Sequence, residues 1–255
     1  MITGFDGKPI EIEKKGFLYP VNMELCETQG QNYLHICVRS YFASTLTEDF
    51  ETITRWKECI FQGFQEWAGE YTVFGGQQLS VTVTTEESSS PSIDTVPILC
   101  LSEEKAREFI LQYTNQNQQA SIEKALLAQR SFSTTMIEGV VSWNSILPRY
   151  IVLMPTAFES ERILQRTAKH EFGHILGLGD SYQDADLGYQ GVGMYHDILP
   201  YYDKQRGFDM VMDNCGPVRN NDIEMVILAF FTNRFQNYQS FQNSLAVSHA
   251  LGRGN

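Results

Sequence analysis

The chain contains few cysteines, and their arrangement argues against a disulfide-stabilised fold. Its 255 residues include five cysteines, at positions 26, 37, 59, 100 and 215, and none of them forms a Cys-x-x-Cys pair. Small disulfide-rich domains carry an even number of closely spaced cysteines, whereas scattered cysteines in odd number favour a reducing compartment.

Basic residues and long apolar runs are also scarce. The chain has 19 Lys and Arg against 31 Asp and Glu, a net charge of -12, which argues against binding nucleic acid or an anionic membrane. No run of about 20 apolar residues predicts a membrane-spanning helix. The first residues also lack the apolar segment of a signal peptide. We therefore expect a protein that stays in the cytoplasm or is exported by a non-classical route, or a secreted one whose leader has been removed.

What the chain does have is enough apolar material for a sizeable core. Hydrophobic residues make up 42% of it and aromatic residues 12%. At this length and composition we expect a single domain over residues 1–255 rather than an extended or disordered chain.

The most informative stretch is His170-Glu171-Phe172-Gly173-His174, followed by Gly177 and Asp180. Two histidines four residues apart share one face of a helix and can bind the same metal ion. Because Glu171 follows the first histidine, its carboxylate can reach a metal-bound water without being a ligand. His-Glu-x-x-His alone is a modest signal for a zinc site. Gly177 and Asp180 at their defined spacing make the signal stronger.

A third metal ligand must come from outside this helical turn. Zn²⁺ in catalytic sites usually takes three protein ligands and one water. Glycine commonly ends a helix in a left-handed turn, so Gly177 would let the chain reverse and Asp180 point back at the metal. The sequence leaves four alternative third ligands open, which are Asp184, Asp186, His196 and Glu224.

These residues together predict the hydrolysis of an amide bond with one Zn²⁺. Zinc lowers the pKa of a bound water and polarises a carbonyl. Glu171 would take the proton of that water and pass it to the leaving amine. The expected substrate is a protein or peptide.

The motif resembles that of the metzincin zinc peptidases, His-Glu-x-x-His-x-x-Gly-x-x-His, and its final Asp resembles the snapalysin-type members. The resemblance implies an α+β fold. Its upper part, about residues 17–177, would hold a twisted mixed sheet and two long helices, and a smaller lower part, about 178–245, would end in a helix. It also implies a methionine turn below the metal, for which Met212 is the candidate. Tyr182 and Tyr195 are candidate stabilisers of the oxyanion.

Hydrophobic periodicity supplies the expected elements. We predict strands at 33–42, 79–84, 137–143 and 150–155, helices at 48–69, 159–176 and 221–239, short helices within 102–131, and loops at 86–92 and 178–221. Thr47 is the expected N-cap of the first helix. Phe50 and Ile163 are among the expected core residues of the first two long helices.

Two other functions are compatible with the same residues. The chain could be a narrow-specificity effector or toxin that cleaves a few proteins. It could also be a non-catalytic zinc-binding module, in which a fourth ligand such as Asp184 or His196 replaces the water.

Overall fold

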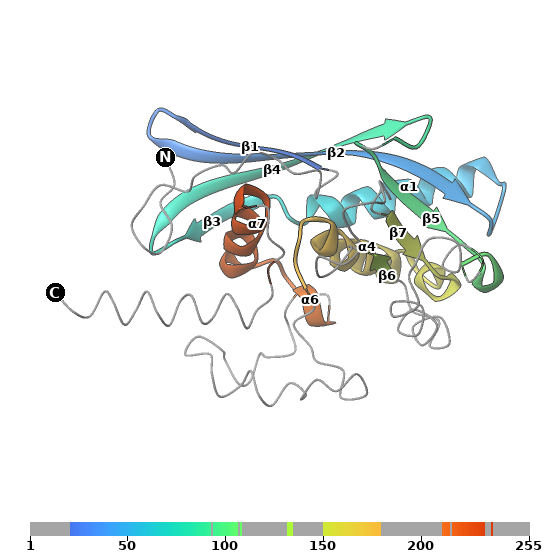
Figure 1. Cartoon of the computed structure of the whole chain (residues 1–255). Helices are drawn as coiled ribbons and strands as arrows, with labels where there is room; N and C mark the ends of the chain where they lie inside the picture. The colour runs from blue at the N-terminus through green and yellow to red at the C-terminus, as the bar shows by residue number, and fades with distance from the viewer. Residues whose placement is uncertain are drawn as a thin grey trace.

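Seven strands form one mixed sheet in the part of the chain that the computed structural model describes, which is residues 21–92, 94–106, 108, 132–134, 150–179, 211–214, 216–232 and 236. Two long helices, α1 (Phe50–Gln65) and α4 (Glu161–Ile175), lie against each other on one side of this sheet (Figure 1). The predicted α+β class, with a mixed sheet and two long helices, is confirmed at this level.

The strands run in the order β3-β4-β2-β5-β7-β6, and β1 pairs with β2. Their bounds are β1 (Val21–Thr28), β2 (Gln31–Ser44), β3 (Gly69–Val73), β4 (Gln77–Ser88), β5 (Val96–Cys100), β6 (Phe132–Thr134) and β7 (Tyr150–Leu153). The central strands β4, β2, β5 and β7 are mutually parallel. The pairings of β1 with β2, β3 with β4 and β6 with β7 are antiparallel.

The alternating pattern of β2 explains which face of the sheet carries the helices. Leu34, Ile36 and Val38 are buried, whereas His35 and Arg39 are exposed. Successive side chains of a strand point to opposite faces, so the apolar set faces the core and the polar set faces away from it. The strand predicted at 33–42 is confirmed, within longer bounds.

Four strands were missed, and the reasons differ. β6 has only three residues, too few to show alternation. β5 is short and buried at every position, so it shows no alternation. β3 begins where the helix predicted at 48–69 was expected to end. β1 has a mixed pattern of buried and exposed residues. The loop predicted at 86–92 begins three residues later than expected, because β4 continues to Ser88 and pairs there with Tyr41.

Some predictions fall outside the described residues. They are the strand at 137–143, most of the helices within 102–131, and most of the loop at 178–221. The strand predicted at 150–155 corresponds to β7, and a 3₁₀ helix (Pro155–Phe158) follows it.

Helix α1 starts later than predicted because Asp49, not Thr47, is its N-cap. The Asp49 carboxylate accepts a hydrogen bond from Thr52 N at 2.9 Å, which satisfies one of the first free N–H groups of the helix. Thr47 Oγ1 instead accepts from Asp49 N at 3.1 Å. Phe50 was wrongly predicted to lie in the core, and it is 78% exposed at the first helical position.

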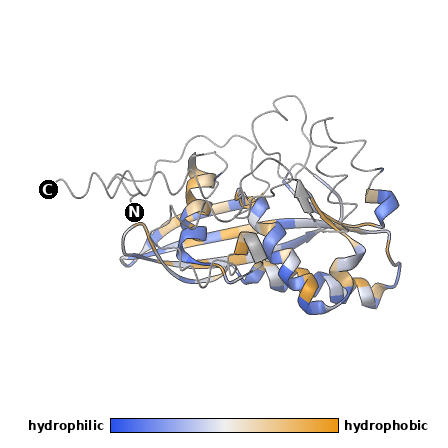
Figure 2. Cartoon of the chain, turned by 90° about the horizontal axis from the view of Figure 1, so that it is seen from below, coloured by the Kyte–Doolittle hydropathy of each residue, from blue (hydrophilic) through white to orange (hydrophobic). Residues whose placement is uncertain are grey.

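Helices α1 and α4 approach each other closely at Gly63. A Cβ atom on Gly63 would overlap the backbone carbonyl of Gln165 and lie 3.1 Å from Ala168 Cβ. Beside this crossing, the rings of Phe64 and Phe172 stack with centroids 4.2 Å apart. Helix α1 buries one side and exposes the other, as expected for a helix that covers a sheet. Figure 2 shows hydrophilic and hydrophobic residues mixed along the helical ribbons. Ile163 lies outside this contact and is 38% exposed, so its predicted place in the core is wrong.

Helix α7 (Asn220–Thr232) packs beside the edge strand β3 (Figure 1). The apolar side of this helix is buried, and comprises Ile223, Val226, Ile227, Phe230 and Phe231. The Asn220 side chain accepts a hydrogen bond from Thr72 N at 3.1 Å, and the Glu224 carboxylate accepts one from Phe74 N. Two side chains of α7 thus bind one N–H group of the edge strand, which would otherwise face solvent, and one N–H group of the turn that follows it.

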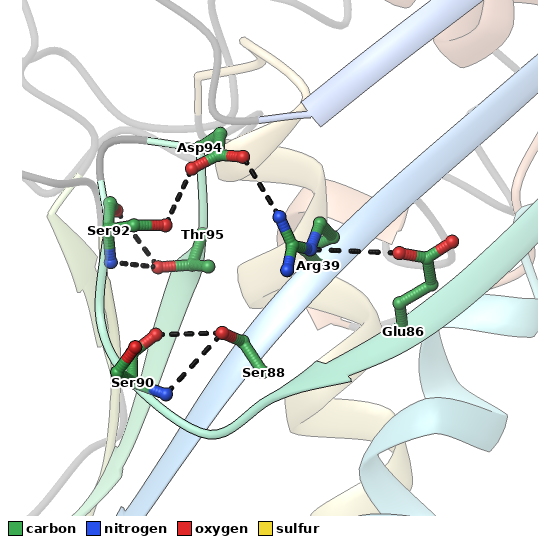
Figure 3. A network of polar contacts seen from close by, with 7 residues as sticks. All are labelled: Arg39, Glu86, Ser88, Ser90, Ser92, Asp94 and Thr95. Atoms are coloured by element: carbon green, nitrogen blue, oxygen red, sulfur yellow. Dashed lines mark hydrogen bonds and ion pairs between the residues drawn. The ribbon is translucent and has the colours of Figure 1, made fainter.

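The connection between β4 and β5 is held to β2 by a polar network around Arg39 (Figure 3). The Arg39 guanidinium lies 3.1 Å from Asp94 Oδ2 and 3.7 Å from Glu86 Oε2. Ser92 donates to Asp94 at 2.6 Å, and Thr95 accepts from Ser92 N at 2.7 Å. These ion pairs are exposed, so they fix the path of the loop more than they stabilise the fold.

The four described cysteines, Cys26, Cys37, Cys59 and Cys100, are free thiols. Burial raises the pKa of Cys100 well above the usual value of a thiol, which makes it unreactive. No helix in the described ranges combines the length and apolar character required for a membrane crossing.

Candidate metal centre

Helix α4 carries the histidine motif in its last two turns. Ser160 caps the helix, and its Oγ accepts a hydrogen bond from Ile163 N at 3.2 Å. His170, Glu171 and His174 are 8%, 3% and 7% exposed. Polar groups are rarely buried to this extent without a specific role or partner, so these side chains are not surface residues that happen to match a pattern.

The two imidazole rings lie next to each other. Their centroids are 5.0 Å apart and their planes are perpendicular. This follows from their spacing, because residues i and i+4 lie one above the other on the same helix face. Glu171 is three residues before His174 and therefore lies on a neighbouring side of the same turn.

Each ring is oriented by a backbone carbonyl. His170 Nδ1 lies 3.0 Å from Val211 O, and His174 Nδ1 lies 2.8 Å from Leu178 O. A carbonyl only accepts hydrogen bonds, so Nδ1 carries the proton in each neutral ring and the lone pair is on Nε2. This is the usual arrangement of zinc-binding histidines, in which the second nitrogen is held by an outer hydrogen bond. The donor set therefore fits a zinc ion.

Helix α4 ends at a left-handed glycine, as predicted. Gly177 has φ of +96°. Gly177 N donates to His174 O at 3.0 Å, and Leu178 N donates to Gly173 O at 3.1 Å. These two bonds form a Schellman motif. The turn also directs the Leu178 carbonyl back at His174. Leu178 therefore closes the helix end through its N–H and orients the second histidine through its carbonyl.

Met212 lies directly against the motif helix. It is part of α6 (Val211–Asn214) and is fully buried. A Cβ atom on Gly173 would overlap its sulfur atom and lie 2.9 Å from Trp67 Cζ2. Met212 therefore packs on the turn that joins the two histidines, and the preceding residue, Val211, supplies the carbonyl for His170.

A second support reaches the motif from the end of α1. Trp67 Nε1 donates to Lys169 O at 3.0 Å. Lys169 Nζ forms an ion pair with Glu66 Oε2 at 2.7 Å, and its side chain is only 5% exposed. Both contacts fix the residue before His170. Trp67 is also fully buried, so the same side chain fills the core.

Glu224, one of the alternative third ligands, has another role. Its carboxylate accepts the hydrogen bond from Phe74 N between α7 and the β3–β4 connection. Burial raises the pKa of Glu224 to about 7, although the hydrogen bond from Phe74 N opposes this shift. Its side chain therefore serves the docking of α7, and we do not retain it as a ligand.

The remaining predicted site residues lie outside the described ranges. They are Asp180, Tyr182, Asp184, Asp186, Tyr195 and His196. Within the described ranges no group of three metal-binding side chains occurs. The structure thus brings together His170, Glu171, His174 and Met212, while the third ligand stays a prediction.

Sequence reasoning missed the groups that orient the histidines. The carbonyl oxygens of Val211 and Leu178 have no sequence signal, because every residue carries a carbonyl. The indole of Trp67 is a weak signal, since a buried tryptophan usually needs an acceptor for its N–H, but the sequence does not say which acceptor.

Comparison with known proteins gives no relative. No protein-family model matches the chain, and no curated protein or solved structure is significantly similar to it. The function must therefore be argued from the site itself.

Proposed function

We propose that this chain is a zinc-dependent endopeptidase of the metzincin type. The observation that carries the proposal is the pair of buried, perpendicular imidazoles, each with Nδ1 held by a backbone carbonyl. A chance match to His-Glu-x-x-His would not require two separate segments to orient the two rings. The α+β architecture and the methionine packed under Gly173 support the same family.

In this proposal His170 and His174 bind the metal through Nε2, and Asp180 is the third ligand. A zinc ion in such a site lowers the pKa of a water molecule and polarises the substrate carbonyl. Glu171 accepts the proton of the attacking water and then donates it to the leaving amine. Glu171 is only 3% exposed and sits on the same helical turn as the two histidines, which places its carboxylate beside the proposed metal.

The first test is the zinc content of the purified protein by elemental analysis. We expect about one zinc per chain, removable by a chelator, and its loss in His174→Ala. Absence of metal, even after incubation with zinc, would refute the proposal.

The second test separates catalysis from metal binding. Glu171→Gln removes the base but no ligand, so this variant should retain zinc while peptide cleavage falls by about 10²–10⁴-fold or more. A wild-type protein that binds zinc but cleaves nothing in a broad peptide library would instead be a non-catalytic zinc module.

A further inference from the structure

The chain that follows α7 returns to the end of the motif helix and pairs with it. Gln236 forms an isolated parallel bridge with Leu178. Its N–H donates to Gly177 O at 2.9 Å, and its carbonyl accepts from Gly179 N, also at 2.9 Å. The backbone of Gln236 is therefore hydrogen-bonded to the residues on both sides of Leu178, which are Gly177 and Gly179.

Leu178 itself is held from the opposite side. Its N–H donates to Gly173 O at 3.1 Å, and its carbonyl lies 2.8 Å from His174 Nδ1. Its side chain is completely buried. Both backbone polar groups of Leu178 thus point at α4, while both of its neighbours are bound to Gln236. A rotation of the Leu178 peptide would break the bond to the histidine, and the two bonds of Gln236 oppose that rotation.

We propose that the backbone of Gln236 is a positioning element of the metal site. It couples the pairing of Gln236 with the turn after α4 to metal binding by His174. This inference rests on the proposed zinc site. Gln236 acts through the turn Gly177–Gly179, so it is a positioning residue and not a ligand. Outer hydrogen bonds of this kind fix the tautomer and direction of a metal-binding histidine, and their loss typically weakens metal binding by about 10–100-fold. Coupling is reciprocal, so zinc should in turn tighten the contact of Gln236 with the turn.

The test compares two variants of the full chain. Gln236→Pro removes the N–H that donates to Gly177 O, whereas Gln236→Ala keeps the backbone unchanged. Zinc affinity is measured by competition with a chelating dye at pH 7. We expect about 10–100-fold weaker binding for Gln236→Pro and a change within about twofold for Gln236→Ala. Equal zinc affinity of the two variants would overturn the inference.

Wild-type protein provides the second measurement, in case Gln236→Pro does not fold by circular dichroism. Hydrogen exchange is followed at the Gly179 and Gln236 amides with zinc and with a chelator. Zinc should slow exchange at both amides more than at amides in the middle of β2. Exchange that does not respond to zinc would refute the coupling.

A third readout keeps this inference separate from the proposed function. If wild-type protein binds no zinc, the proposed function fails. The tautomer of His174 then tests, without any metal, whether Gln236 positions this histidine. Nitrogen-15 NMR of the imidazoles should show the Nδ1–H tautomer in wild type and its partial loss at His174, but not at His170, in Gln236→Pro. An unchanged His174 signal would overturn the inference by itself.

Discussion

The thioether of Met212 packs against Gly173, the glycine between the two histidines of α4. Any side chain at position 173 would force Met212 or Trp67 to shift, because a Cβ atom would meet both the Met212 sulfur and the Trp67 ring. The glycine in the middle of the motif is therefore a packing requirement that lets α6 and the end of α1 come close to the histidines.

The first prediction concerns Gly173→Ala. Alanine normally favours a helix by about 1 kcal/mol over glycine, but here the added methyl group should destabilise the fold by about 1–3 kcal/mol through overpacking. It should also weaken zinc binding, because displacing α6 moves the Val211 carbonyl from His170. Urea unfolding and dye competition measure the two effects. Adding Met212→Ala removes one of the overlapping groups, so the double variant should be less destabilised than the sum of the single ones.

The second prediction concerns the crossing of α1 and α4. Gly63→Ala should lower the free energy of unfolding by about 1–3 kcal/mol, since the new methyl group meets the backbone carbonyl of Gln165, which cannot move aside as a side chain can. Gln62→Ala, at an exposed position of the same helix, is the control and should change stability little. Equal stabilities of the two variants would show that the helices can separate without cost.

The sequence predicted those parts of the fold that rest on local patterns. Alternation identified β2, and helical periodicity identified α1, α4 and α7. It failed where two local signals competed, as at the start of α1. There Thr47 and Asp49 both can cap a helix, and the choice of Asp49 leaves Phe50 in solvent.

The candidate site was predictable only as a list of side chains. Spacing placed His170 and His174 on one face, and Gly177 marked the turn, because these are properties of a single helix. The acceptor for His170 is Val211, 41 residues further along the chain. The acceptor for His174 is Leu178, only four residues away, but its turn is held by the distant Gln236. Long-range backbone contacts of this kind depend on tertiary packing, which composition and periodicity do not encode.

The third prediction concerns a buried hydroxyl group in the sheet. Ser40 is 1% exposed, and its Oγ has no hydrogen-bond partner among the described residues. Burial of a hydroxyl without a partner is costly, so Ser40→Ala should raise the free energy of unfolding by about 1 kcal/mol. Ser44→Ala provides the contrast. Its Oγ accepts from Leu46 N at 3.2 Å, so losing it should lower stability by about 1 kcal/mol. Chemical denaturation of both variants tests the difference in sign.

The fourth prediction is a pH dependence that arises from Glu224. Its pKa is raised from 4.5 to about 7, mainly by burial, so the folded protein holds this proton more tightly than the unfolded chain does. The associated stability is fully present below about pH 4.5 and is lost as the pH rises through 7. Glu224→Gln keeps an oxygen acceptor for Phe74 N but cannot ionise. It should therefore match wild type near pH 4.5 and be more stable at pH 9, by up to about 3 kcal/mol.

The matched control for this measurement is Glu70→Gln on the exposed side of the neighbouring strand β3. Both variants remove one carboxylate, so any general effect of net charge on stability is common to them. Urea unfolding at several pH values between 4.5 and 9 should give a difference from wild type that grows with pH for Glu224→Gln and stays nearly constant for Glu70→Gln. A constant difference for both would mean that Glu224 ionises in the folded protein as easily as in the unfolded chain. The hydrogen bond from Phe74 N would then fully offset the cost of burying the charge.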